Sequence, residues 1–318
     1  MDGPLLLNRL AFDPEGERRE LLAGLLRDPA SIPPKYFYDE LGCALYGAIC
    51  RLPEYYPTRT EVALFQARRL EIAEAIGPGR QFVDLGAGDC CKAKGWLPVL
   101  SPVRYVAVDI AIHEITAALD RLAPDFPGLE LVGVATDFAR ALELDGVLAD
   151  SPALFFYPGS SIGNFTPAEA RVFLARIRHY CVARPGSSLL IGVDGKKEKA
   201  LLDAAYDDAL GVTAAFNRNM LRHLNAKFGL GFDVGGFAHV GFYNEAEGRI
   251  EMHLESVRDQ AVLLDGLERV FRKGERIHTE NSYKYAPAEF EEVLSDAGFA
   301  SIRRWDAVGV AYSVYHAA

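Results

Sequence analysis

Acidic side chains and glycines follow three successive apolar runs of the chain, where they could together bind a nucleotide-like ligand. The run FVDLGAGD carries Gly86 and Gly88, the run YVAVDIA carries Asp109, and the run LELVGVATDF ends in Asp137 and Phe138. In open α/β sheets, ligands bind beyond the carboxyl ends of the strands, and glycines there let the backbone approach the ligand. We therefore expect these five residues to line one ligand site.

The glycine pattern favours S-adenosylmethionine over a nicotinamide dinucleotide. A dinucleotide loop reads GxGxxG, and Cys91 stands where its third glycine should be. S-adenosylmethionine has no pyrophosphate, and its cationic sulfonium and zwitterionic tail suit an acid-x-G-x-G loop. Asp109 can accept both ribose hydroxyls, while Asp137 accepts from the adenine amino group and Phe138 packs beside the base. The alternative is that both aspartates cap the following helices.

A parallel sheet is needed to bring these residues to one edge. Five apolar runs end in acids, glycines or small polar residues, and they alternate with helical segments such as 112–122 and 167–180. Thr166 and Glu169 form a helix start of the capping-box type. Continuous apolar strands that alternate with helices predict a parallel sheet covered on both faces. The predicted fold class is therefore α/β, with one open-sheet domain.

The alternation stops after about residue 196, which predicts a second, smaller lobe. The following residues are richer in helix and polar aromatics, and the segment GRIEMHLESV alternates like an antiparallel strand. The last 30 residues return to a helix and two strands. We expect an S-adenosylmethionine-binding domain at 61–196 plus 287–318. The substrate-binding lobe would comprise 1–60 plus 197–286.

Composition excludes several classes of protein. The 318 residues carry a net charge of −10, from 34 basic and 44 acidic residues, which argues against a nucleic acid partner. No apolar run reaches the length of a membrane span. The five cysteines show no CxxC or Cys/His spacing, so we expect no metal and a reducing cytoplasm. Early acids and arginines argue against a signal peptide. We expect a monomer, because no long apolar helix face is left over.

Several longer strings carry a resemblance to a known family. They are PPKYFYDELG, RLPEYYPTRTE, PGSSIGNFTP, AAYDDALGVTAAFNRNML, FYNEAEGRIEMHL and IHTENSYKY. From about residue 30 onward, the chain resembles the histidine-specific, S-adenosylmethionine-dependent N,N,N-methyltransferases of ergothioneine biosynthesis. The family loop usually reads Gly-Ser-Gly, then small polar residues and Lys-Thr. Here it reads GAGDCCKA, which departs from that pattern but keeps Lys92.

The resemblance implies that the α/β domain is a Rossmann-like class I methyltransferase domain, and that the reaction is trimethylation of the α-amine of L-histidine. It also implies a role for each matched residue. Tyr38 and the backbone around Gly159 would lie near the amine, with Tyr38 as the catalytic residue. The remaining substrate contacts would be Asn164 and Tyr206 to the carboxylate, Tyr55, Glu280 and Ser282 to the imidazole, and Met252 lining the imidazole pocket. The implied cofactor contacts are Gly86, Lys92, Asp109, Asp137 and Phe138.

The residue types agree with these roles, although each has a simpler interpretation. Asn164 offers a donor and an acceptor to an amino acid, or it serves a turn. Glu280 can accept from an imidazole N–H. Alternatively, Glu280 and Ser282, two residues apart, form the exposed face of a strand. We expect His253 and His278 to be packed or solvated rather than ligands.

Three other functions remain open at this point. One is a methyltransferase for another amino acid, such as tryptophan or a modified histidine, although Met252 and Glu280 favour histidine. A second is a noncatalytic S-adenosylmethionine-binding protein, against which Tyr38, Asn164 and Tyr206 argue. The third is a nicotinamide dehydrogenase, which the glycine pattern disfavours.

Overall fold

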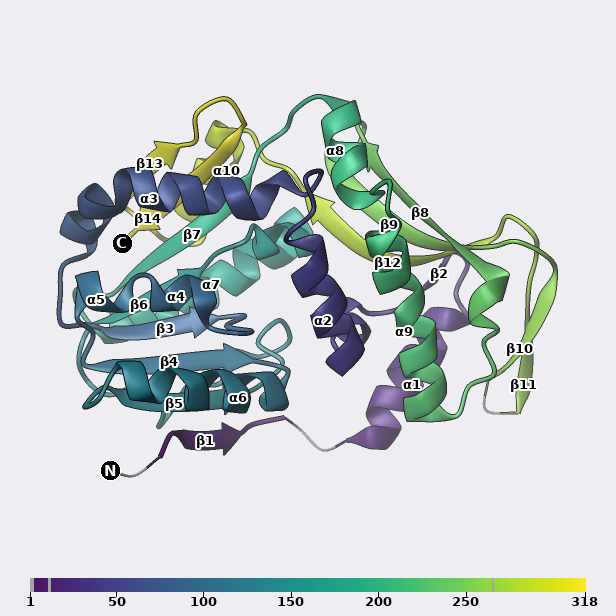
Figure 1. The fold of residues 1–318 in the computed structure, drawn as a ribbon, viewed down its shortest axis with the longest axis horizontal. Coiled ribbons are helices and arrows are strands. Elements are labelled where there is room, and N and C mark those ends of the chain that lie inside the picture. Colours follow the sequence, from purple (N-terminus) through teal and green to yellow (C-terminus); the bar gives the residue numbers. More distant parts are fainter. Residues whose placement is uncertain (1–2, 11–12, 265) are drawn as a thin grey trace. The chain divides into compact units, whose positions relative to one another are not determined.

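The chain divides into two compact units, each built from separate stretches of sequence (Figure 1). The computed structural model describes residues 3–10, 13–264 and 266–318. The first unit contains residues 3–10, 57–196 and 284–318, and the second contains 13–56 and 197–283.

The division differs from the expected domain boundaries at the beginning of the chain. Strand β1 (Leu5–Asn8) pairs in parallel with β5 (Glu130–Ala135), so it extends the sheet of the first unit. The sequence pattern predicts residues 1–60 in the substrate-binding lobe, so β1 differs from this expectation. A strand of only four residues is too short for its sequence pattern to reveal this pairing.

An eight-stranded sheet forms the centre of the first unit, in the order β1-β5-β4-β3-β6-β7-β14-β13. Its further strands are β3 (Gln81–Leu85), β4 (Arg104–Asp109), β6 (Ala153–Tyr157), β7 (Ser188–Asp194), β13 (Ile302–Asp306) and β14 (Tyr312–Ala317). β14 runs antiparallel to both of its neighbours, and the other pairings are parallel. The predicted α/β class is confirmed. Chain order runs outward from β3 through β4 to β5 on one side and from β6 to β7 on the other, and ligands bind at such a reversal.

Helices cover both faces of this sheet. They are α3 (Tyr56–Ile76), α4 (Cys91–Lys94), α5 (Leu97–Leu100), α6 (Ile112–Leu122), α7 (Pro167–Ala183) and α10 (Pro287–Asp296), with short 3-10 turns η2 (Ala123–Asp125) and η3 (Ser161–Asn164). In β6, Phe156 packs on Phe65 of α3, with ring centroids 5.8 Å apart. Its neighbour Phe155 packs on Tyr180 of α7, at 6.1 Å. Since successive strand residues point to opposite faces, α3 and α7 cover opposite sides.

The second unit is built on a four-stranded sheet in the order β2-β12-β9-β8. These strands are β2 (Ala30–Ser31), β12 (Arg276–Tyr283), β9 (Arg249–Ser256) and β8 (Phe237–Asn244). The helices are α1 (Pro14–Leu25), α2 (Glu40–Ile49), α8 (Lys199–Tyr206) and α9 (Val212–Phe228), with η1 (Pro34–Phe37), η4 (Val234–Gly236) and the hairpin β10 (Gln260–Leu264)–β11 (Leu267–Phe271). β9 pairs antiparallel with β8 and β12, as the alternation in GRIEMHLESV predicts.

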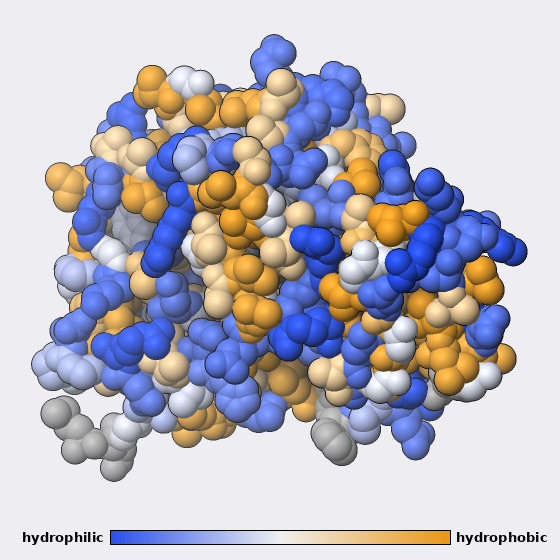
Figure 2. Space-filling model, turned by 45° about the vertical axis from the view of Figure 1, so that its right-hand side comes forward, coloured by the Kyte–Doolittle hydropathy of each residue, from blue (hydrophilic) through white to orange (hydrophobic). Residues whose placement is uncertain are grey.

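Polar and apolar side chains are mixed over the surface drawn in Figure 2. Hydrophilic residues, in blue, lie between scattered hydrophobic residues in orange. Within the described residues, every helix is too short or too polar to cross a bilayer.

Candidate active site

The glycine loop after β3 adopts a backbone that favours glycine. Gly86 and Gly88 have φ angles of +72° and +49°, in the left-handed region that side chains rarely adopt. The amides of Gly86 and Ala87 donate to the carbonyl of Val108, at 2.8 and 3.1 Å, which ties the loop to the end of β4. A Cβ atom on Gly86 would lie 3.7 Å from Cζ of Phe138. The loop therefore presents bare backbone beside an aromatic ring.

Asp109, at the end of β4, holds this loop through its side chain. Its Oδ2 accepts from the amide of Gly88 and its Oδ1 from the amide of Ala111, both at 3.0 Å. Burial raises the pKa of Asp109, and the two backbone amides partly offset that rise. Because a carboxylate can accept about four hydrogen bonds, it retains acceptor capacity for two hydroxyls.

Asp137 and Phe138 follow β5 and are half-buried. The Phe138 ring packs on Tyr157 and Phe173, with centroids 6.0 and 5.9 Å away. Asp137 accepts from the amide of Arg140 at 3.4 Å, which is long for a helix cap. The bare glycine backbone, a carboxylate with spare acceptor capacity and an anchored ring fit S-adenosylmethionine.

Lys92 makes an ion pair that the sequence does not reveal. It lies on α4, directly after the glycine loop, and its Nζ is 2.8 Å from Oε2 of Glu61 on α3. Glu61 is fully buried, and its Oε1 accepts from the amide of Gly159 and the hydroxyl of Tyr312, both at 2.7 Å. Glu61 is the functional candidate missed by sequence reasoning. Its signal is an acid in the apolar helix stripe that includes Leu64.

The loop after β6 approaches this ion pair closely. Gly159 has φ +80°, and a Cβ atom there would lie 2.9 Å from Nζ of Lys92. The amide of Asp194, at the end of β7, donates to Oγ of Ser160 at 2.9 Å. Asn164 ends η3 and is half-buried. The structure thus places Gly159 beside Lys92 within the first unit.

The adjacent cysteines of the loop show no redox pairing. Cys90 is buried and Cys91 is exposed, and both are free thiols. Burial raises the pKa of Cys90 to about 12, so this thiol stays protonated and unreactive. Burial also raises the pKa of Asp84 to about 7, although its Oδ2 accepts from the Tyr105 hydroxyl at 2.8 Å. The hydrogen bond between Asp84 and Tyr105 is buried and links β3, which leads into the glycine loop, to β4.

The residues that the resemblance assigns to the imidazole gather in the second unit. The hydroxyl of Tyr206 donates to Oγ of Ser282 at 2.9 Å, and the ring of Tyr55 contacts that of Tyr206 edge-on, with centroids 6.0 Å apart. Glu280 stands opposite Met252 in the β12–β9 pair. All five side chains are buried. The interpretation of Glu280 and Ser282 as an exposed strand face is therefore wrong.

A β-bulge in β12 sets which way these residues face. The register with β9 shifts between His278 and Glu280, and the hydroxyl of Thr279 donates to the carbonyl of Met252 at 3.0 Å. Beyond the bulge the pairing is regular, so Glu280 and Ser282 share one face. The extra residue puts His278 and Asn281 together on the other face, where they are bonded at 2.9 Å.

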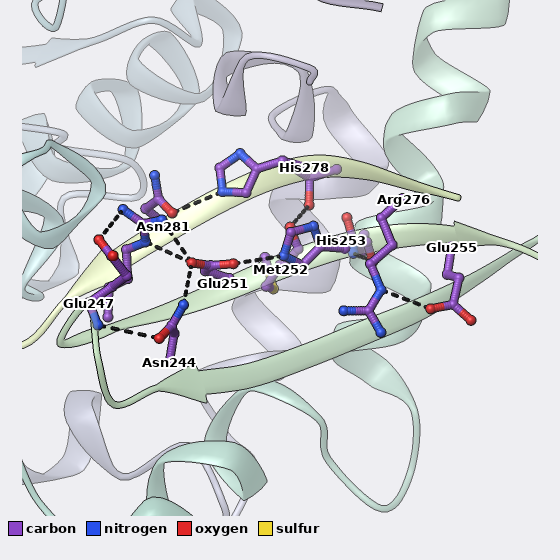
Figure 3. A network of polar contacts seen from close by, with 12 residues as sticks. Asn244, Glu247, Glu251, Met252, His253, Glu255, Arg276, His278 and Asn281 are labelled. Carbon is purple, nitrogen blue, oxygen red and sulfur yellow. Dashed lines mark hydrogen bonds and ion pairs between the residues drawn. The ribbon is translucent and has the colours of Figure 1, made fainter. Parts of the chain in front are cut away.

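That other face carries the polar network shown in Figure 3, centred on Glu251. Its carboxylate accepts from Arg249 at 2.9 Å, and from Asn244 and His253 at 3.1 Å. Burial lowers the pKa values of His253 and His278. Among the described residues, no group of three or more His, Cys, Asp or Glu side chains could hold a metal ion. Both histidines are packed within the network, as expected.

Two further groups position the second-unit residues. Tyr38 follows η1 and packs edge-on against Tyr46, with ring centroids 6.2 Å apart. Nε2 of His239 donates to the carbonyl of Tyr206 at 2.8 Å, and Nδ2 of Asn217 donates to Nδ1 of His239 at 2.8 Å. An amide NH₂ only donates, so His239 is neutral there. His239 and Asn217 were not found from the sequence.

Comparisons with known proteins give a consistent result. The chain matches the family described as histidine-specific, S-adenosylmethionine-dependent methyltransferase over residues 17–318. Histidine N-alpha-methyltransferase of Mycobacterium tuberculosis is 40% identical, covering 91% of this chain and 90% of that protein. Its counterpart in Mycolicibacterium smegmatis is 38% identical, covering 94% of each. A 4-dimethylallyltryptophan N-methyltransferase of Arthroderma benhamiae is 28% identical, covering 97% and 95% respectively. The chain therefore belongs to the family of histidine-specific, S-adenosylmethionine-dependent methyltransferases.

Proposed function

We propose that this protein methylates the α-amine of L-histidine three times, giving trimethylhistidine as the first step of ergothioneine formation. Family membership over residues 17–318 supports this, and so do two relatives named histidine N-alpha-methyltransferase. The observation that carries the substrate choice is the buried carboxylate of Glu280, which is 8% exposed and stands opposite Met252. A buried carboxylate suits a substrate that offers an N–H donor.

On the cofactor side, Asp109 would accept the ribose hydroxyls, and Asp137 and Phe138 would hold the adenine. The open backbone at Gly86 and Gly88 supports this, and Lys92 lies directly after that loop. S-adenosylmethionine supplies a methyl group on a cationic sulfonium.

On the substrate side, Tyr38 and the Gly159 backbone would hold the amine, and Asn164 and Tyr206 the carboxylate. Tyr55, Glu280 and Ser282 would bind the imidazole, with Met252 in contact with the ring. The hydrogen bond from Tyr206 to Ser282 supports placing these two side chains in one site.

The amine must be neutral when it reacts, because only then does nitrogen carry a lone pair. We propose that its proton leaves to water, directly or through the Tyr38 hydroxyl. At subsaturating histidine, kcat/KM should therefore rise with pH toward the pKa of the amine. A flat profile from pH 6 to 9, with chemistry shown to be limiting, would contradict this.

A tryptophan-derived acceptor is the second candidate, because one relative is named for such a substrate. Mass spectrometry separates the candidates. The protein is incubated with S-adenosylmethionine and the twenty amino acids, plus 4-dimethylallyltryptophan. We expect one, two and three added methyl groups on histidine. Methylation of the tryptophan derivative in place of histidine would reject the proposal.

The role of Glu280 is tested by kcat/KM for histidine and tryptophan. Glu280→Ala should lose about 2–4 kcal/mol of transition-state stabilisation with histidine, the value of a buried charged hydrogen bond, and much less with tryptophan. Glu255→Ala is the control, because this glutamate lies on β9 in a surface ion pair with Arg276. An unchanged histidine-to-tryptophan ratio in Glu280→Ala would remove Glu280 from imidazole recognition.

A further inference from the structure

Glu61 joins three separate elements of the first unit through one buried carboxylate. Its Oε2 pairs with Nζ of Lys92 on α4 at 2.8 Å. Its Oε1 accepts from the amide of Gly159, after β6, and from the hydroxyl of Tyr312 on β14, both at 2.7 Å. The side chain of Glu61 has no exposed surface. This arrangement fixes the carboxylate and whatever it pairs with.

The positive charge of Lys92 balances the negative charge of the Glu61 carboxylate. A carboxylate without contact to water needs a cationic partner, because its desolvation is costly. The Lys92 side chain remains 30% exposed, so the pair is buried at the carboxylate and accessible at the ammonium. An accessible ammonium whose charge is already matched presents much less positive potential than a lone lysine.

Lys92 lies where the proposed reaction needs low positive potential. It follows the glycine loop after β3, and its Nζ is next to Gly159, in the loop after β6. These two strands flank the reversal of strand order, where ligands of such sheets bind. Methyl transfer carries a positive charge from sulfur to nitrogen, so a cation occupies the site before and after each step. An unmatched lysine ammonium there would repel that cation.

We infer that Glu61 is a positioning residue that neutralises Lys92, and thereby lets the site prefer cationic S-adenosylmethionine to its uncharged-sulfur product, S-adenosylhomocysteine. The inference rests on the proposed function for the identity of the two ligands. S-adenosylmethionine carries one more positive charge than the product, and the two have nearly the same shape. Their relative affinity therefore reports the local charge rather than the fit.

Calorimetric titration of both ligands tests this without measuring activity. In Glu61→Gln, the ratio Kd(S-adenosylmethionine)/Kd(S-adenosylhomocysteine) should rise on the order of fivefold, as an added unit charge predicts at moderate distance and effective dielectric. In Glu61→Gln/Lys92→Met, the ratio should return close to the wild-type value. Glu71→Gln is the control, because Glu71 lies on the same helix in an exposed pair with Arg68.

If Glu61→Gln weakens the binding of both ligands by the same factor, Glu61 has a merely structural role and the inference is overturned. A double variant that keeps the raised Kd ratio would also overturn it. If Glu61→Gln does not fold, Lys92→Met is used for the test. Because this variant leaves the Glu61 carboxylate unmatched, the ratio Kd(S-adenosylmethionine)/Kd(S-adenosylhomocysteine) must fall below the wild-type value. An unchanged or higher ratio would overturn the inference. A wild type that binds both ligands but does not methylate histidine would refute the proposed function and leave this charge test intact.

Discussion

Replacing Gly159 with alanine should damage the protein in two separable ways. The backbone at Gly159 has φ +80°, where an alanine costs about 1–2 kcal/mol. The new Cβ would also lie 2.9 Å from Nζ of Lys92. A lysine end is usually free to move, but this one is held 2.8 Å from the buried carboxylate of Glu61.

The second effect can be isolated with a matched control. Gly79 has φ +75°, and a Cβ atom there would meet nothing within 4 Å, so Gly79→Ala has the backbone cost alone. Displacing Lys92 weakens a charge-assisted hydrogen bond worth about 1.5–3 kcal/mol. Gly159→Ala should therefore lose about 2.5–5 kcal/mol of unfolding free energy, against about 1–2 kcal/mol for Gly79→Ala.

Urea unfolding followed by tryptophan fluorescence is the appropriate assay. The chain has two tryptophans, Trp96 and Trp305, and both are buried in the first unit with the two glycines. The signal therefore reports the unit that carries the substitutions. If the two variants lose the same free energy, the contact between Lys92 and Gly159 contributes nothing and the reasoning about this ion pair is refuted.

Three other perturbations have definite expected results. Asp109→Ala should weaken S-adenosylmethionine binding by about 1–3 kcal/mol in calorimetric titration, and unchanged affinity in a folded variant would remove Asp109 from the site. Lys284→Met takes the cation from the buried Asp194 carboxylate, 3.0 Å away, and should lower the unfolding free energy by about 3–5 kcal/mol. The exposed pair of Lys196 should give at most about 1 kcal/mol in Lys196→Met, and equal losses would contradict the burial argument. Burial lowers the pKa of His316 to about 4, so the folded state binds fewer protons than the unfolded state, and stability should fall between about pH 6.5 and pH 4. His316→Asn should lessen that fall in urea titrations at pH 7 and pH 5, and an unaltered fall would exclude His316 as its source.

Local patterns in the sequence predict much of the first unit. The apolar runs become β3 to β7, α6 spans Ile112–Leu122 as expected, and the capping box of Thr166 and Glu169 starts α7. Each signal lies within a few neighbouring residues, because burial on both faces and helix caps act on short segments. The alternation of strands and helices accounts for the parallel pairing of β3 to β7.

The parts that escaped prediction depend on contacts between distant segments. The sequence around Glu61 predicts only an ordinary helix residue, because its partners Lys92, Gly159 and Tyr312 lie far from it along the chain. The bulge at Thr279 depends on pairing with β9, so the spacing of Glu280 and Ser282 alone could not show that both are buried. Single-sequence patterns carry no information about such long-range partners.

The place of β14 in the large sheet has a consequence for how the protein is made. β14 lies between β7 and β13, yet the whole of 197–283 separates β7 from these strands along the chain. A ribosome therefore exposes β7, with an unpaired strand edge, while it synthesises residues 197–283, the C-terminal part of the second unit. During that interval the buried carboxylate of Glu61 also lacks the Tyr312 hydroxyl. Such an open edge is a site where a nascent chain can aggregate or recruit a chaperone, so the vulnerable period in biosynthesis falls late in translation.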